Sequence, residues 1–170
     1  MTKKAATLLP FALMVGIIAT DQLSKWLVVE KLEPATAYPV IGDFFRLYLV
    51  RNPGAAFSFG SDATVIFSLI QLVAVAVCCV LALRNSSMWA AVPIGLIGGG
   101  AAGNLIDRIF REPGGFHGHV VDFFSFGSFA IFNVADAAIT VGVVCYLYYA
   151  FAVEPKEHAA KQQEQEAAQQ

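Results

Sequence analysis

Two aspartates, Asp122 and Asp136, are the residues whose type and setting best suit chemistry. Asp122 lies within the apolar patch VVDFF, and Asp136 heads an apolar run that continues to Val153. A carboxylate at the start of a membrane helix is costly to place, so it is a functional hypothesis by default. Two carboxyl groups held close in a low dielectric share a proton, because both cannot ionise cheaply. One can then take a proton from an attacking water while the other protonates a leaving amine, which is a route to amide hydrolysis.

Other interpretations of the same residue types stay open. Asp122 and Asp136 could each pair with Arg108 or a loop arginine and only lock helices together. Ser24 and Lys25 could form a serine–lysine peptidase, but neighbours in a helix diverge.

Two weaker interpretations concern single residues. Ser58 with Lys25 is a further serine–lysine pairing without support from spacing. His117 and His119 suggest a metal, but no third ligand follows at suitable spacing, so we predict no metal site.

The composition indicates a membrane protein of one domain. Of the 170 residues 57% are hydrophobic and only 14% are charged, against about 25% charged in a typical soluble domain. Mean hydropathy is +0.62. The net charge of −2 predicts no nucleic-acid partner, and the three cysteines lie in apolar runs as small hydrophobic residues.

Hydropathy predicts an all-α membrane fold, a bundle of four spans, because a span needs about 20 mostly apolar residues. The spans are expected at about 8–29, 63–83, 89–109 and 133–153, within one integral membrane domain of residues 1–153. Residues 154–170 form a polar tail, expected to be helical or disordered. The third span carries Gly95, Gly99 and Gly103 at intervals of four, a smooth face that lets another helix approach closely.

Two long loops, 30–62 and 111–132, are expected on the side opposite the termini. The first holds a predicted short strand at 44–50 and a turn at Asn52, Pro53 and Gly54, and the second carries Asp122. We expect residues 44–62 to clamp or cover a substrate.

Three spans bring polar residues to this loop side, and the bilayer makes each costly unless they face one another. The expected polar cluster comprises Asp21 to Lys25, Asn104, Asp107, Arg108, Asn133 and Asp136, beside Asn52 and Asp122. Arg108 could hold Asp107, Asp21 or a substrate carbonyl with its planar fork. Lys3 and Lys4 before the first span favour termini on the cytoplasmic side.

Five motifs in order resemble the lipoprotein signal peptidases (signal peptidase II), bacterial inner-membrane aspartyl peptidases. The match runs from about Thr20 to Val143. The motifs are DQLSK from Asp21, RNPGAAFSF from Arg51, GGGAAGNLIDR from Gly98, HVVDFF from His119 and FNVADAAITVG from Phe132.

The resemblance implies that Asp122 and Asp136 are catalytic. It implies that the site is lined or supported by Asp21, Asn52, Gly54, Asn104, Arg108 and Asn133. It also implies four helices with cytoplasmic termini, a small extracytoplasmic β-cradle and a short surface helix. Substrates would be diacylglyceryl-modified prolipoproteins, cut just before the modified cysteine by a monomer in the inner membrane. No metal or other cofactor is needed, and cyclic peptides such as globomycin would inhibit.

Two rival classes of membrane protein stay open beside this resemblance. A small ion- or proton-coupled transporter would explain intramembrane acids, although no internal repeat is evident. A membrane scaffold would explain the glycine face but not two acids with Asn133 beside one of them.

Overall fold

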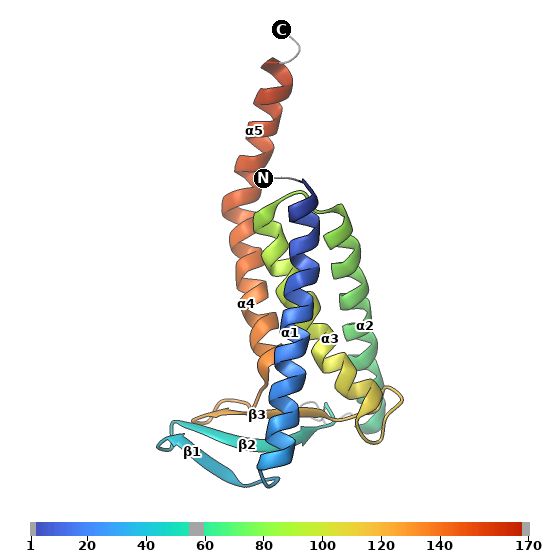
Figure 1. Cartoon of the computed structure of the whole chain (residues 1–170), viewed down its shortest axis with the longest axis vertical. Helices are drawn as coiled ribbons and strands as arrows, with labels where there is room; N and C mark the ends of the chain where they lie inside the picture. The colour runs from blue at the N-terminus through green and yellow to red at the C-terminus, as the bar shows by residue number, and fades with distance from the viewer. Residues whose placement is uncertain (1–2, 55–59, 168–170) are drawn as a thin grey trace.

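The computed structural model describes residues 3–54 and 60–167 as a helical bundle with a small sheet at one end (Figure 1). The main helices are α1 (Lys3–Lys31), α2 (Gly60–Arg84), α3 (Met88–Phe110) and α4 (Val134–Tyr148). A π-helical turn, η2 (Tyr149–Val153), joins α4 to α5 (Glu154–Ala167). Both termini lie at the end away from the sheet (Figure 1). We call the two ends the terminal side and the sheet side.

Among the described residues, four helices are long and apolar enough to cross a membrane. They are Lys3–Lys31, Thr64–Arg84, Met88–Phe110 and Val134–Glu157, which confirms the predicted four-span fold. The tail, expected to be helical or disordered, is helical as α5 and follows α4 through η2.

Helix α3 is the centre of the bundle, and its glycines explain why. It packs against α1, α2 and α4. A Cβ on Gly99 would lie 3.0 Å from the Met14 Cα of α1, and one on Gly103 would lie 2.7 Å from the Asp21 Oδ2. The predicted close approach along this face is therefore confirmed, with α1 as the partner helix.

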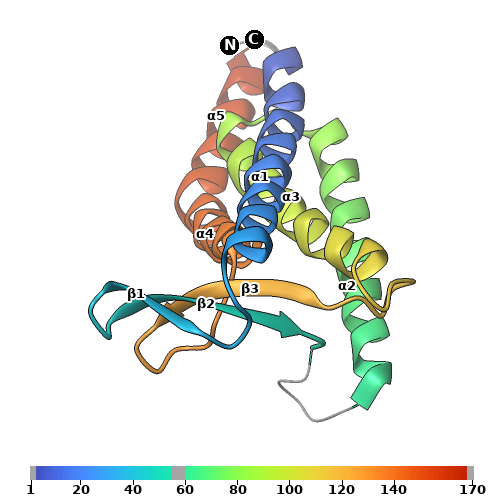
Figure 2. The same cartoon turned by 60° about the horizontal axis from the view of Figure 1, so that its bottom comes forward.

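A three-stranded antiparallel sheet lies across the sheet-side ends of the helices (Figure 2). Its strands are β1 (Ala37–Ile41), β2 (Phe45–Asn52) and β3 (Val120–Phe126), in the order β1-β2-β3. The predicted strand at 44–50 corresponds to β2. The interpretation of 111–132 as loop throughout was wrong, because VVDFFSF pairs with β2 as β3.

The sheet is fixed to the bundle by a small apolar core. Val28 of α1 packs with Leu49, Val121 and Phe123 of the sheet, and all four are buried. This packing fixes Asp122, which lies between two core residues of β3. The surface helix that the resemblance implies would follow β2, where residues 55–59 lie outside the described part of the chain.

The α3–α4 contact generates a test of packing. In Gly100→Ala the new Cβ would lie 2.5 Å from the Ala135 backbone oxygen, which cannot rotate away. We expect the two helices to separate and the free energy of unfolding to fall by about 1–3 kcal/mol, measured by thermal unfolding in detergent. Gly16→Ala is the control, since no atom lies within 4 Å of its Cβ position. Equal melting temperatures for the two variants would contradict the packing described.

Candidate active site

Asp122 and Asp136 meet through one residue, Asn133. Asn133 caps the N-terminus of α4. Its side-chain Oδ1 accepts from the Asp136 backbone N–H at 2.9 Å, and its backbone N–H donates to the Asp136 Oδ2 at 3.2 Å. This capping box follows from the Asn-x-x-Asp spacing. The Asn133 Nδ2 donates to the Asp122 Oδ1 at 2.6 Å. A single asparagine thus binds a carboxyl from β3 and one from α4.

Two more asparagines complete the contacts of the pair. The Asn52 Nδ2 donates to the second Asp122 oxygen at 2.9 Å, and the Asn104 Nδ2 donates to the Asp136 Oδ1 at 2.7 Å. The Asn104 Oδ1 accepts from Asn133 at 3.0 Å. The structure thus brings the three asparagines and the two aspartates together. Each hydrogen bond that the asparagines donate to the two carboxyls comes from a neutral amide.

Gly54 orients Asn52. Its amide donates to the Asn52 Oδ1 at 2.8 Å, and its φ of 90° is in the region that favours glycine. A Cβ at Gly54 would also lie 3.0 Å from the ring of Phe67. The glycine therefore allows the tight turn that aims the Asn52 amide at Asp122.

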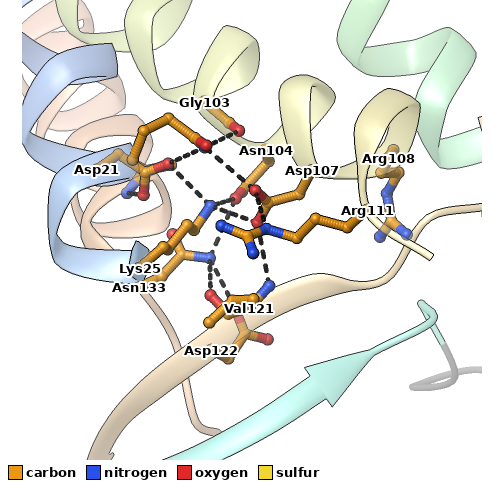
Figure 3. A network of polar contacts seen from close by, with 12 residues as sticks. Asp21, Lys25, Gly103, Asn104, Asp107, Arg108, Arg111, Val121, Asp122 and Asn133 are labelled. Atoms are coloured by element: carbon orange, nitrogen blue, oxygen red, sulfur yellow. Dashed lines mark hydrogen bonds and ion pairs between the residues drawn. The ribbon is translucent and has the colours of Figure 1, made fainter. Parts of the chain in front are cut away.

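A buried ionic network lies next to Asn104 and Asn133 (Figure 3). The Lys25 Nζ lies 2.8 Å from the Asp21 Oδ2 and 3.0 Å from the Asp107 Oδ2, and all three side chains are fully buried. Lys25 also donates to the Asn104 Oδ1 at 2.8 Å, and Arg111 pairs with Asp107 at 2.7 Å. We call Asp21, Lys25, Asp107 and Arg111 the ionic network. Its two carboxylates and two cations balance.

The ionic network also holds the backbone beside each member of the pair. The Asp21 Oδ1 accepts from the Ala135 amide at 3.0 Å, one residue before Asp136. The Asp107 Oδ2 accepts from the Val121 amide at 3.0 Å, one residue before Asp122. Asp21 and Asp107 therefore position the two site aspartates through the main chain.

Arg108 lies to one side of this network (Figure 3). The expectation that it holds Asp21 or Asp107 was wrong, because Lys25 and Arg111 occupy those carboxylates. Arg108 is 5% exposed and donates from Nη1 to the Gly118 carbonyl at 3.2 Å, and its Nε has no partner in the described part of the chain. Within the described residues it makes no ion pair, yet its charge acts on Asp122 and Asp136.

Several alternatives can now be compared with the contacts. No ion pair among the described residues includes Asp122 or Asp136, so the expected pairing with Arg108 or a loop arginine is not seen there, and asparagine amides contact both carboxyls instead. Ser24 donates to the Asp21 carbonyl, and Lys25 is held in the ionic network, so these two do not form a peptidase pair. Ser58 lies outside the described residues.

Other features of the sequence bear on the site less directly. Among the side chains that the structure describes, no three from His, Cys, Asp or Glu gather as metal ligands. The role of Lys25 in the ionic network was missed. The i,i+4 spacing of Asp21 with Lys25, and of Asp107 with Arg111, is the signal that could have found it.

Burial sets the electrostatics of Asp122. It raises the pKa of this carboxyl from 3.8 to about 6, and the Asp136 carboxylate adds to the rise. Hydrogen bonds from Asn52 and Asn133 oppose it. Asp122 can therefore exchange a proton near neutral pH, as an acid–base group must.

The chain is similar to known proteins over most of its length. A family model described as signal peptidase (SPase) II matches residues 13–152. The lipoprotein signal peptidase of Rhodococcus jostii is 44% identical over 137 residues, 81% of this chain and 69% of that protein. The lipoprotein signal peptidase of Streptomyces coelicolor is 44% identical over 149 residues, which are 88% of this chain and 72% of that protein. A solved structure described as a bacterial membrane enzyme has a TM-score of 0.75 at 26% identity, covering 85% of this chain and 93% of that one.

The ionic network predicts a large loss of stability when Lys25 is neutralised. Lys25→Met leaves Asp21 facing Asp107 without a shared cation, and we expect a loss of about 3–5 kcal/mol in unfolding free energy. Adding Asp21→Asn should restore part of it, since Asp107 keeps Arg111. Thermal unfolding in detergent measures both, with the exposed Lys31→Met as control. A single variant as stable as the control would refute the role of Lys25.

The raised pKa of Asp122 predicts a pH-dependent stability difference. The folded state binds the proton more tightly than the unfolded chain, so wild type loses stability as pH rises from about 4 through 6. Asp122→Asn removes this loss. The unfolding free energy of the variant relative to wild type should therefore increase by up to roughly 3 kcal/mol between about pH 4 and pH 8.

Melting curves across this range measure the difference, and the exposed Asp43→Asn serves as the control. A difference that does not change with pH would show that Asp122 keeps its ordinary pKa in the folded protein.

Proposed function

From the premise that the chain belongs to the signal peptidase II family and removes signal peptides from prolipoproteins, we propose that Asp122 and Asp136 perform the hydrolysis. The observation that most supports this proposal is that Asn133 donates hydrogen bonds to both carboxyls. The chain is thus a multi-pass membrane peptidase, and its catalytic type, in our proposal, is aspartic.

The proposed reaction is addition of water to an amide. The ionised carboxyl of the pair takes a proton from water, and the water oxygen bonds to the carbonyl carbon. The protonated carboxyl donates to the carbonyl oxygen. When the tetrahedral intermediate collapses the C–N bond breaks, and the amine leaves with a proton from the pair. The pair titrates as a unit, so the two roles are not assigned to individual aspartates.

Arg108 suits a positioning role in this reaction. Its Nε has no partner among the residues that the structure describes, and its Nη2 lies 3.5 Å from the Cβ position of Gly54. Arginine donates two parallel hydrogen bonds from a planar group. We assign Arg108 to a substrate backbone carbonyl, which would complete its hydrogen bonds beside the pair.

The surroundings support a lipid-anchored substrate. Asp122 belongs to β3 and Asp136 to the first turn of α4, and β3 lies at the sheet-side end of the apolar spans (Figure 1). A scissile bond at the membrane surface could therefore reach the pair. In this proposal the sheet side is extracytoplasmic, the termini are cytoplasmic, and the protein is a monomer of the bacterial inner membrane. Cleavage falls just before a diacylglyceryl-modified cysteine, and cyclic peptides such as globomycin compete for the site.

Strand β2 contributes directly to the site. Residues 44–62 were expected to clamp the substrate, but β2 within them pairs with β3 and supplies Asn52 to Asp122. The transporter alternative has no support from the comparisons, in which the relatives are peptidases by name.

Cleavage of a diacylglyceryl-modified prolipoprotein by the purified protein tests the pair. Asp122→Asn and Asp136→Asn keep the shape of the side chain but cannot exchange the proton. Each should lower kcat by at least about 10²–10⁴-fold, the usual contribution of a general acid or base. Mass analysis should place the wild-type cut before the lipidated cysteine, and an unlipidated substrate should remain uncut.

Asp43→Asn is the matched control, because Asp43 is exposed on the sheet side. Folded Asp122→Asn and Asp136→Asn variants that cleave at the control rate would show that the pair is structural. Cleavage of the unlipidated peptide at the same rate would show that the anchor is not recognised.

A further inference from the structure

Titration as a unit does not make the two carboxyls of the pair equivalent, because their hydrogen-bond donors differ. The asparagines that donate to Asp122 are themselves held by neutral groups. The Asn52 Nδ2 donates to the Asp122 Oδ2 at 2.9 Å, and the Asn52 Oδ1 accepts from the Gly54 backbone N–H at 2.8 Å. The Asn133 Nδ2 donates to the Asp122 Oδ1 at 2.6 Å, and the Asn133 Oδ1 accepts from the Asp136 backbone N–H at 2.9 Å.

The asparagine that donates to Asp136 from α3 is held by a cation instead. The Asn104 Nδ2 donates to the Asp136 Oδ1 at 2.7 Å, and the Asn104 Oδ1 accepts from the ammonium of Lys25 at 2.8 Å (Figure 3). Hydrogen bonds in a chain polarise one another, and a low local dielectric strengthens them. A positive charge at the oxygen of this amide makes its N–H groups stronger donors, which favours a negative charge on Asp136.

The backbone around each carboxyl acts in the same direction. Asp136 is the third residue of α4, and its Oδ2 accepts from the Asn133 backbone N–H at 3.2 Å. The N-terminus of a helix carries a partial positive charge that stabilises a carboxylate in the first turn. Asp122 lies in a strand, and a sheet has only a small net dipole. The helix therefore favours the ionised form at Asp136 and gives no such help to Asp122.

Burial separates the two carboxyls further. Asp122 is 3% exposed, whereas Asp136 is half-buried. Removal from water penalises the charged form of a carboxyl. Burial raises the pKa of Asp122 to about 6, although hydrogen bonds from Asn52 and Asn133 and the charge of Lys25 oppose the rise. Asp122 is therefore the member of the pair that its surroundings favour in the protonated form.

The charged groups around the pair come from α1, α3 and β2. They are Asp21, Lys25, Asp107, Arg108, Arg111 and Arg51. The four members of the ionic network balance one another, and the charge of Arg108 acts on both carboxyls of the pair. Arg51 is exposed and precedes Asn52 in β2, so the alternation of side chains directs it to the other face of the sheet. The Lys25 ammonium reaches one carboxyl through a hydrogen-bonded chain, and this chain distinguishes the two.

We propose that Lys25, acting through Asn104, keeps Asp136 ionised and makes it the base of the pair. Asp122 is then the acid. Lys25 and Asn104 are positioning residues in this account, which rests on the proposed function of the pair.

The proton transfers of the reaction then have fixed directions. Asp136 takes a proton from water while the water oxygen bonds to the carbonyl carbon, and Asp122 gives its proton to the carbonyl oxygen. When the intermediate collapses, Asp136 passes its proton to the leaving nitrogen as the C–N bond breaks. Asp122 recovers a proton from a hydroxyl of the intermediate, so the starting state of the pair is restored.

The pH dependence of kcat/KM for a diacylglyceryl-modified prolipoprotein tests this assignment. Activity falls on the acidic limb when the base takes up a proton, and on the basic limb when the acid loses one. Asn104→Leu and Asn52→Leu are matched variants, since each removes one amide donor from one carboxyl. Loss of a donor makes the ionised form less stable, so the carboxyl keeps its proton to a higher pH.

We expect Asn104→Leu to move the acidic limb, and Asn52→Leu the basic limb, upward by roughly 1–2 pH units. The double variant Lys25→Met, Asp21→Asn removes the ammonium but keeps Asn104, and it should also move the acidic limb upward. A merely structural role of Lys25 would lower kcat/KM at every pH and leave both limbs in place.

Carbon-13 NMR of the full chain, labelled at its aspartate carboxyl groups, gives a second measurement that does not depend on activity. Protonated and ionised carboxyls have different chemical shifts. At about pH 5, one unit below the value for Asp122, Asp122→Asn should remove the resonance of a protonated carboxyl. Asp136→Asn should remove that of an ionised one.

Three results would overturn the assignment: a shift of the basic limb in Asn104→Leu, limbs that neither asparagine variant moves, or loss of the protonated resonance in Asp136→Asn. Failure of the proposed function has a different signature. In that case folded Asp122→Asn and Asp136→Asn variants would cleave at the rate of the Asp43→Asn control.

Discussion

The ammonium of Lys25 between the carboxylates of Asp21 and Asp107 is the contact on which the site depends. Burying these charges costs several kcal/mol per ion, and only close pairing offsets it. The pairing therefore fixes how α1 and α3 lie against each other. Each carboxylate uses its other contacts to hold a backbone amide, at Ala135 and at Val121. One buried contact thus sets the positions of both Asp136 and Asp122.

The division between charged and neutral partners gives the two sets of aspartates different chemistry. Asp21 and Asp107 contact cations, which favour the ionised form and suit a structural role. Asp122 and Asp136 contact asparagine amides instead. At Asp122 the effect of burial outweighs these neutral donors and raises the pKa to about 6, so this carboxyl can hold a proton. An ion pair at either position would remove the acid that the proposed reaction needs.

The polar cluster could be predicted from the sequence because a polar side chain that faces lipid is costly in free energy, which limits where such residues can lie. Three helix ends on one side had to face one another, and the Asn133 to Asp136 spacing indicated a capped helix start. The partners within the cluster were not predictable in this way. Asp107 was open to Arg108, Arg111 or Lys25 by residue type alone, and only the helix register selects two of them. Strand β3 was missed because its pairing with β2 joins distant segments.

Helix α2 differs from the other spans in how it is held, and this bears on how a substrate in the bilayer reaches the pair. Separating α1 from α3, or α1 from the start of α4, breaks buried contacts of the ionic network. At its sheet-side end α2 is joined by neutral hydrogen bonds, from Thr64 to the Pro53 carbonyl and from Ser68 to the Phe116 carbonyl. Such bonds contribute about 1 kcal/mol each, against several for a buried ion contact. The described contacts at the sheet-side end of α2 are therefore weaker than those that hold α1 against α3 and against the start of α4.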